Sequence, residues 1–304
     1  MSIDSPTLGD VTVNLDGLWL LQALLGIPNL APELNAVPYG AGPDDSWLDQ
    51  HPGLEVLRTE GLVDTDRQVA PALAQRIQVL ATPDVEVAMR VSRGPMDWTP
   101  LVDLDDPATW LAIPEEQLRV VLARRDGRWV SAVRGGDQVT INDVAVEDGG
   151  AEWLRSVALG ILDGLHPCEP AIMTPLTLPL EDIAKAAAER AELPEGAPRD
   201  APLRAIGLSG ATLAQLAILL EDPLMDAVIY ARAYDDTRVD YSAAMLNLRD
   251  TEAGRVVAHR MTAVRGSTQD WMSFAPATGP AVEQAIRTVL TSLPIARWES
   301  HRRM

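Results

Sequence analysis

The clearest alternation of apolar and polar positions lies in residues 118–146, and it predicts three consecutive β-strands. Apolar residues recur at every second position through 118–122 and again through 129–133, which is the period of strands with one buried face. Asp126-Gly127 separates the first two runs, and Asp-Gly between alternating apolar residues is a strong signal for a tight hairpin. Gly135-Gly136 supplies a second turn. We therefore expect an antiparallel meander in the middle of a sheet.

The rest of the chain alternates between helical and extended patterns. Apolar residues at helical spacing predict helices over 17–26, within 47–61, and over 66–81, 151–165, 183–191, 210–221 and 279–293. Asp16 and Ser209 are the predicted N-caps of the first and sixth of these helices. Further strands are predicted at 11–15, 85–92, near 176–178, and at 225–234, 245–248, 256–260 and 271–274.

The two halves of the sequence resemble each other. Leu73-Ala74-Gln75 recurs as Leu213-Ala214-Gln215, and Leu80 and Pro83 recur as Leu220 and Pro223, each 140 positions later. In both halves a strand, a strand pair and an amphipathic helix follow. We expect an α+β fold in which two pseudo-two-fold-related halves, 1–165 and 166–304, share one antiparallel sheet with two helical layers as a single globular unit.

Residues 94–117 break the regular pattern and form the main candidate for a binding site. Connections of this length without regular structure are uncommon and are often functional. This one contains six acidic residues and no basic ones. Its apolar residues favour a loop that is ordered, or ordered by a partner, over a solvated excursion. The candidate partner-binding residues of this loop are Trp98, Leu101, Asp103, Asp105, Trp110 and Leu111.

Composition restricts the possible partners and the compartment. The formal net charge of −19 argues against binding to nucleic acid or to an anionic membrane. Cys168 is the only cysteine, so an internal disulfide and a thiolate metal cluster are excluded. We expect a cytoplasmic protein without a signal peptide or a membrane-inserted segment.

The sequence contains no strong catalytic or cofactor-binding motif. It lacks a Gly-rich phosphate loop, a G-x-S-x-G elbow and an H-E-x-x-H pair. Asp103, Asp105 and Asp106 resemble cation ligands, but Pro107 and the missing Gly and Glu positions exclude an EF-hand loop. Cys168 is predicted to be inert because no histidine is placed near it. We expect no enzyme activity, no cofactor and no metal.

Several segments resemble the EspG family, the secretion-associated chaperones of mycobacterial type VII (ESX) systems. They are VTVNLDGLWLLQALLGIPNLAPEL at 11–34, WLDQHPGLEVLRTEGLV at 47–63, LRVVLARRDGRWVSAV at 118–133, YARAYDD at 230–236 and the Leu-Pro-x-x-x-Trp ending at 293–298. The similarity runs nearly from end to end and is strongest to the member that serves the ESX-5 system.

The resemblance implies a cytosolic chaperone that binds PE–PPE heterodimers at the tip of the PPE helical hairpin. It would keep them soluble and deliver them to the secretion machinery without nucleotide. The family's partner surface maps here to 94–117 and to roughly 205–240, with Arg238 at a position where a relative carries a basic interface residue. A basic residue expected in the long loop is missing, which leaves the cognate PE–PPE pairs open.

Two alternatives come from other functional classes. One is a small-molecule-binding or hydrolytic α+β enzyme whose site, with a carboxylate or His259, lies between the halves. The other is a self-associating scaffold, whereas the chaperone reading predicts a monomer in which dimerisation stays open.

Overall fold

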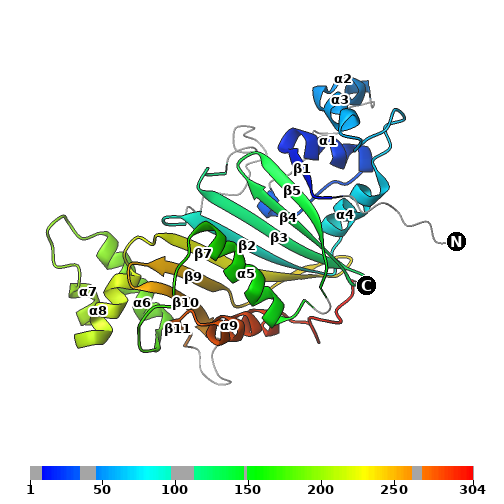
Figure 1. Cartoon of the computed structure of the whole chain (residues 1–304). Coiled ribbons are helices and arrows are strands. Elements are labelled where there is room, and N and C mark those ends of the chain that lie inside the picture. The colour runs from blue at the N-terminus through cyan, green and yellow to red at the C-terminus, as the bar shows by residue number, and fades with distance from the viewer. Residues whose placement is uncertain (1–8, 35–45, 97–112, 147–148, 262–268, 304) are drawn as a thin grey trace.

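The computed structural model describes residues 9–34, 46–96, 113–146, 149–261 and 269–303. These residues form an 11-stranded antiparallel sheet with helices on both faces (Figure 1). The strands in spatial order are β1 (Val11–Asn14), β5 (Gln138–Val144), β4 (Arg128–Gly135), β3 (Gln117–Arg125), β2 (Val85–Arg93), β7 (Met225–Tyr234), β9 (Leu246–Thr251), β10 (Gly254–Met261), β11 (Trp271–Pro276) and β6 (Leu176–Pro179). The short β8 (Val239–Tyr241) pairs only with β7. The predicted α+β class is confirmed.

The predicted meander is β3, β4 and β5. Asp126 and Gly127 both have positive φ angles, 51° and 83°, as a two-residue turn between right-twisted strands requires. Their turn sets the register in which Arg125 lies opposite Arg128. Gly136, with φ of 58°, forms the second turn.

The first half adds one 3-10 turn and four helices before β2. These are α1 (Leu15–Leu25), η1 (Pro32–Leu34), α2 (Ser46–Gln50), α3 (Pro52–Thr59) and α4 (Pro71–Ala81). The predicted cap Asp16 is wrong, because the Asn14 side chain accepts the hydrogen bond from the Gly17 N–H and α1 begins at Leu15, two residues earlier than predicted. Helix α4 begins at Pro71 and not at 66, because Val63 and Val69 form a β-bridge and Asp64 accepts from the Gln68 N–H.

The meander is followed by α5 (Ala151–Leu165), and the second half repeats the order of the first. Its helices are α6 (Leu180–Ala191), α7 (Ala201–Ala205), α8 (Gly210–Leu219) and α9 (Gly279–Thr291). Ser209 is the N-cap residue of α8, although its side chain makes no capping hydrogen bond.

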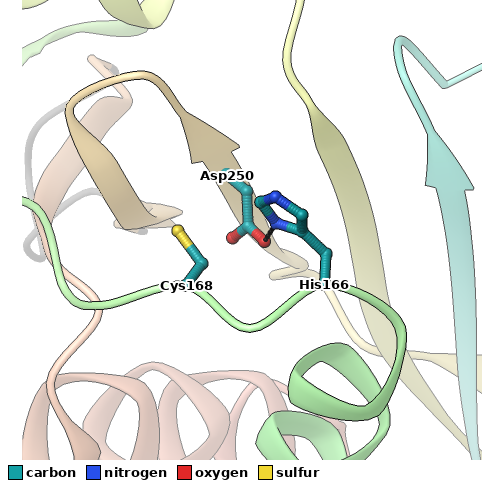
Figure 2. Close-up of side chains that lie close together, drawn as sticks. All are labelled: His166, Cys168 and Asp250. Carbon is teal, nitrogen blue, oxygen red and sulfur yellow. Dashed lines mark hydrogen bonds and ion pairs between the residues drawn. The ribbon is translucent and has the colours of Figure 1, made fainter.

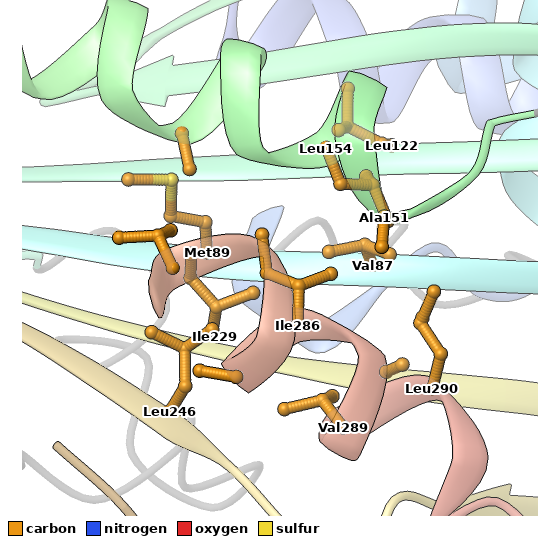
Figure 3. Close-up of a cluster of buried hydrophobic side chains, with 14 of the residues drawn as sticks. Val87, Met89, Leu122, Ala151, Leu154, Ile229, Leu246, Ile286, Val289 and Leu290 are labelled. Carbon is orange, nitrogen blue, oxygen red and sulfur yellow. The ribbon is translucent and has the colours of Figure 1, made fainter. Parts of the chain in front are cut away.

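Three apolar cores hold the helices to the sheet. On one face α5 and α9 pack side by side across the middle strands, with Val87, Met89 and Ile229 beneath them (Figure 3). On the opposite face, α1 and α4 cover the end that contains Val121 and Val130, with α3 packed on α1 and α2 on α3, and α6–α8 cover the other end. The middle of that opposite face, on β2 and β7, carries buried charged residues. We call this middle the charged face.

The strand order has the symmetry that the repeated sequence predicts. Read outward from the β2–β7 pair, each half presents three further antiparallel strands and then its own first strand at the edge. Met89 lies opposite Ile229, its own counterpart 140 positions later. The pseudo-two-fold axis therefore passes between β2 and β7. None of the described helices is long and apolar enough to cross a membrane.

Candidate functional site

Most of the candidate residues lie outside the described part of the chain. Trp98, Leu101, Asp103, Asp105, Trp110 and Leu111 all fall within 97–112. The structure does define where this segment begins and ends: Met96 and Ile113 are both buried at its two ends.

The base of this segment is fixed beside the turn between α8 and β7. The Gly94 N–H donates to the Leu224 carbonyl at 3.0 Å, and the Arg93 N–H donates to the Glu116 carbonyl at 3.2 Å. Leu224 and Ile218, at this turn, expose about half and two fifths of their surface. The structure thus places the two ends of the long loop beside the α8–β7 turn, which is part of the region 205–240.

Arg238 lies at the other end of β7, in the turn that leads to β8. Ten residues of β7 separate Leu224 from this turn, a distance of roughly 30 Å at the rise of an extended chain. The Arg238 side chain is 61% exposed and contacts Asp240 at 2.7 Å and Asp235 at 3.9 Å. The structure therefore does not bring Arg238 to the base of the loop.

Sequence reasoning missed an exposed apolar segment next to Arg238. Val239, Tyr241 and Met245 expose 42%, 59% and 52% of their surface, and with Arg238 we call them the β8 surface. Val239 and Tyr241 lie opposite Tyr234 and Arg232, so they share the charged face with them. The apolar–polar–apolar order at 239–241 was the available signal, but it equally predicts a buried strand.

The charged face between these two regions is built around Arg232. Its guanidinium donates to the carboxylates of Glu33 and Glu86, and the Tyr230 hydroxyl donates to Glu33 as well. The guanidinium also lies over the rings of Tyr230 and Tyr241, 5.3 and 5.4 Å from their centroids. Tyr241 therefore links the buried charges to the exposed β8 surface.

The pKa values of the two carboxylates are shifted in opposite directions. Burial works to raise the pKa of Glu33, but Arg232 and the Tyr230 hydroxyl outweigh it and hold that pKa below its usual value. Burial raises the pKa of Glu86 to about 7, against the attraction of Arg232 and with the repulsion of Glu33 added. Burial and the charge of Glu33 raise the pKa of Tyr230 to about 12. Glu33 is thus the carboxylate that carries the charge opposite Arg232, and it fastens η1 to the sheet.

The junction of the two halves, where the enzyme alternative places its site, offers little room for a small molecule. The cavity where the two halves meet has a volume of about 20 Å³ and is lined by aliphatic side chains and one methionine (Figure 3). It holds no converging polar groups of the kind that small-molecule sites need. His259 lies on β10 between β9 and β11, away from the junction of the halves.

The expectation that Cys168 lies far from any histidine is wrong. His166 follows α5 directly, and its ring, the Cys168 thiol and the Asp250 carboxylate have ligating atoms within 4.8 Å of one another. Burial and the charge of Asp250 raise the pKa of the Cys168 thiol, which is the opposite of what a nucleophile needs.

Comparison with known proteins is consistent across the whole chain. The family model described as EspG matches residues 14–288. The ESX-5 secretion-associated protein EspG5 of Mycobacterium tuberculosis is 39% identical over 298 residues, which cover 97% of each chain, and the Mycobacterium marinum protein of that name has the same identity and coverage. The ESX-1 secretion-associated protein EspG1 of M. tuberculosis is 26% identical over 295 residues, which cover 96% of this chain and 90% of that one.

A solved structure has the same fold. The M. tuberculosis type VII secretion system chaperone EspG5, in complex with a PE25–PPE41 dimer, superimposes with a TM-score of 0.81 at 36% identity, over 96% of this chain and 99% of that one. The strand order, the family match and this similarity lead to one conclusion: the chain belongs to the EspG family.

Proposed function

We propose that this protein is a chaperone of a type VII (ESX) secretion system, most similar to those of ESX-5, and that it binds PE–PPE heterodimers. The observation that carries the proposal is the match to EspG5 over nearly its whole length, because that protein was solved with a PE–PPE dimer bound. The fold that binds the dimer in that complex is therefore matched over 96% of this chain.

The finer proposal concerns what is bound and where. The chaperone acts in the cytoplasm, covers the apolar tip of the PPE helical hairpin, and catalyses no reaction. Covering that tip keeps the dimer soluble by mass action: the ratio of bound to free dimer equals the concentration of free chaperone divided by the dissociation constant. Support comes from an exposed apolar surface on a rigid sheet and from a net charge of −19, which opposes self-association.

We propose that the tip docks against the long loop and the α8–β7 turn, with the β8 surface as the second contact region. Interface energy is concentrated in a few aromatic anchors. Trp98 and Trp110 are the candidate anchors of the loop, and its other candidate contacts are Leu101, Leu111, Asp103 and Asp105. Arg238 is the candidate charged contact of the β8 surface.

Co-expression with the PE–PPE pairs of its own secretion cluster tests the proposal. At least one pair should become soluble and co-purify as a 1:1:1 complex. A PE–PPE pair from a different ESX cluster is the control for specificity. If every cognate pair stays insoluble or elutes without the chaperone, the proposed function is wrong.

The role of the loop is tested by Trp98→Ala and Trp110→Ala. Each variant should fold normally, and at least one should weaken binding by roughly 1–3 kcal/mol, as expected for an aromatic anchor. Isothermal titration calorimetry measures the change, and Trp47→Ala on α2 is the matched control. Unchanged affinity in both loop variants would remove 94–117 from the interface and leave the α8–β7 turn.

A further inference from the structure

A cluster of three different metal-ligating side chains lies outside the proposed interface. His166 and Cys168 come from the connection after α5, and Asp250 comes from β9 (Figure 2). The His166 Nδ1 atom lies 2.9 Å from an Asp250 carboxylate oxygen, and all three ligating atoms lie within 4.8 Å of one another. Donor atoms around tetrahedral zinc are about 3.5 Å apart, so side-chain rotations alone can close the set.

The backbone that carries these residues is held in place. The Arg255 N–H donates to the Glu169 carbonyl at 2.7 Å, and the Ala171 N–H donates to the Arg255 carbonyl at 2.9 Å. Gly254 allows this approach: its φ is 110°, and a Cβ there would lie 2.7 Å from the Ala171 Cα atom. The connection is thus pinned to β10 with both ligand side chains against Asp250.

The surrounding charges suit a divalent cation. Arg255 occupies one position on each Asp250 oxygen, at 2.6 and 3.0 Å, and donates to Asp163 at 2.6 Å. Each carboxylate oxygen has further lone pairs for a metal. When a metal binds, the Cys168 thiol would release its proton, and two carboxylates, one guanidinium and the thiolate would together carry a formal charge of two negative, which a dication neutralises. Arg255 then serves as the outer partner that orients the carboxylate ligand.

The arrangement differs from a catalytic Cys-His-Asp set. In Figure 2 the Asp250 carboxylate lies between the thiol and the imidazole, so the ring is not placed to take the proton of the thiol. Nitrogen, sulfur and oxygen ligands on a partly exposed loop suit zinc, with water as the fourth ligand. We propose that His166, Cys168 and Asp250 form a zinc site that fastens the connection after α5 to the β9–β10 hairpin, in contrast to the sequence-based expectation of no metal.

Zinc binding to the full chain, reduced and treated with chelator, tests the site. Competition with a chromophoric chelator should give one zinc ion per chain, and His166→Gln and Cys168→Ser should each weaken its affinity at least ~10-fold, as loss of a site residue typically does. Glu169→Gln, an exposed acidic neighbour outside the set, is the matched control and should bind normally. Circular dichroism confirms that the variants fold.

Cobalt as a zinc substitute distinguishes this site from adventitious binding to an acidic chain. The cobalt-loaded wild type should show a thiolate-to-cobalt charge-transfer band that Cys168→Ser abolishes. Fewer than one bound ion per chain, equal affinity in all variants, or a cobalt spectrum without the thiolate band would each overturn the proposal. The wild-type spectrum decides the question even if a variant does not fold.

Discussion

Glu86 is a residue whose protonation is coupled to folding. It is fully buried on β2, and its partner Arg232 is already engaged by Glu33. The unfolded chain releases this proton near 4.5, whereas burial in the fold raises the pKa to about 7. Between these values the folded state holds more protons than the unfolded state, so the free energy of unfolding falls as pH rises and levels off above about 7.

Glu86→Gln should remove this part of the pH dependence. A neutral amide does not titrate, so the variant should lose less stability than the wild type between about pH 5 and about pH 8. Urea unfolding at both pH values measures the difference, with the exposed Glu116→Gln as control. Equal slopes in the Glu86 variant and the wild type would show that Glu86 ionises normally.

Arg238→Glu should slow association with an acidic partner. Asp235 and Asp240 already contact Arg238, so charge reversal leaves three acidic side chains together on the β8 surface. Steering effects of this kind change the association rate several-fold and fade with salt. Stopped-flow association at low and high salt measures the effect.

Arg287→Glu is the matched control for this substitution. Arg287 is similarly exposed and paired with Glu283, but it lies on α9, on the other face of the sheet. A loss of association that is independent of salt, or an equal loss in the Arg287 variant, would contradict a steering role for Arg238.

At the scale of elements, local turn chemistry made the sheet predictable. Asp126-Gly127 permits little except a tight hairpin, and the alternating runs beside it fix which side chains are buried. The bounds 225–234 are predicted without error and confirmed, because a mainly apolar run, interrupted only by Asp226 and Arg232, is bounded by Pro223 and Asp235.

Other features depended on contacts that local sequence does not encode. Asn14 and Asp16 are both good caps, and only the pairing of β1 with β5 decides that the strand ends at Asn14. The proximity of His166 to Asp250 needs a connection pinned across 84 residues. The β8 surface looks apolar in sequence like any core strand, so its exposure was not predictable. The loop residues of the candidate site stay a prediction.

Gly254→Ala should destabilise the hairpin of β9 and β10. The new methyl group would require φ of 110° in a non-glycine residue and would overlap the backbone of Ala171, a combination that costs on the order of 1–3 kcal/mol or more. Thermal unfolding measures the loss. Gly136→Ala is the control: its φ is also positive, but nothing lies within 4 Å of the added atom, so only the backbone cost of about 1 kcal/mol remains.

At the scale of the molecule, the two halves depend on each other. We propose a boundary between 165 and 166, yet the core beneath α5 and α9 draws side chains from both sides of it. The Arg155 guanidinium also donates to Glu283 across these helices at 2.9 Å.

Residues 1–165 expressed alone should therefore aggregate or self-associate. The β2 edge and the apolar face beneath α9 would be exposed, and unpaired edges promote association. Light scattering measures the size of the fragment, and co-expression with 166–304 should restore a complex of the two. A monomeric, cooperatively folded 1–165 would contradict the proposal of one globular unit.

The pairing of Met89 with Ile229 also bears on how such a molecule arose. A strand that lies antiparallel to its own copy is the geometry of a symmetric homodimer, so a single ancestral half would have closed its sheet by joining edge to edge with an identical chain. Fusion of two copies in tandem would then allow each half to change independently of the other. The two halves differ beside this central pair: the first carries the long connection after β2, and the second carries β8 after β7.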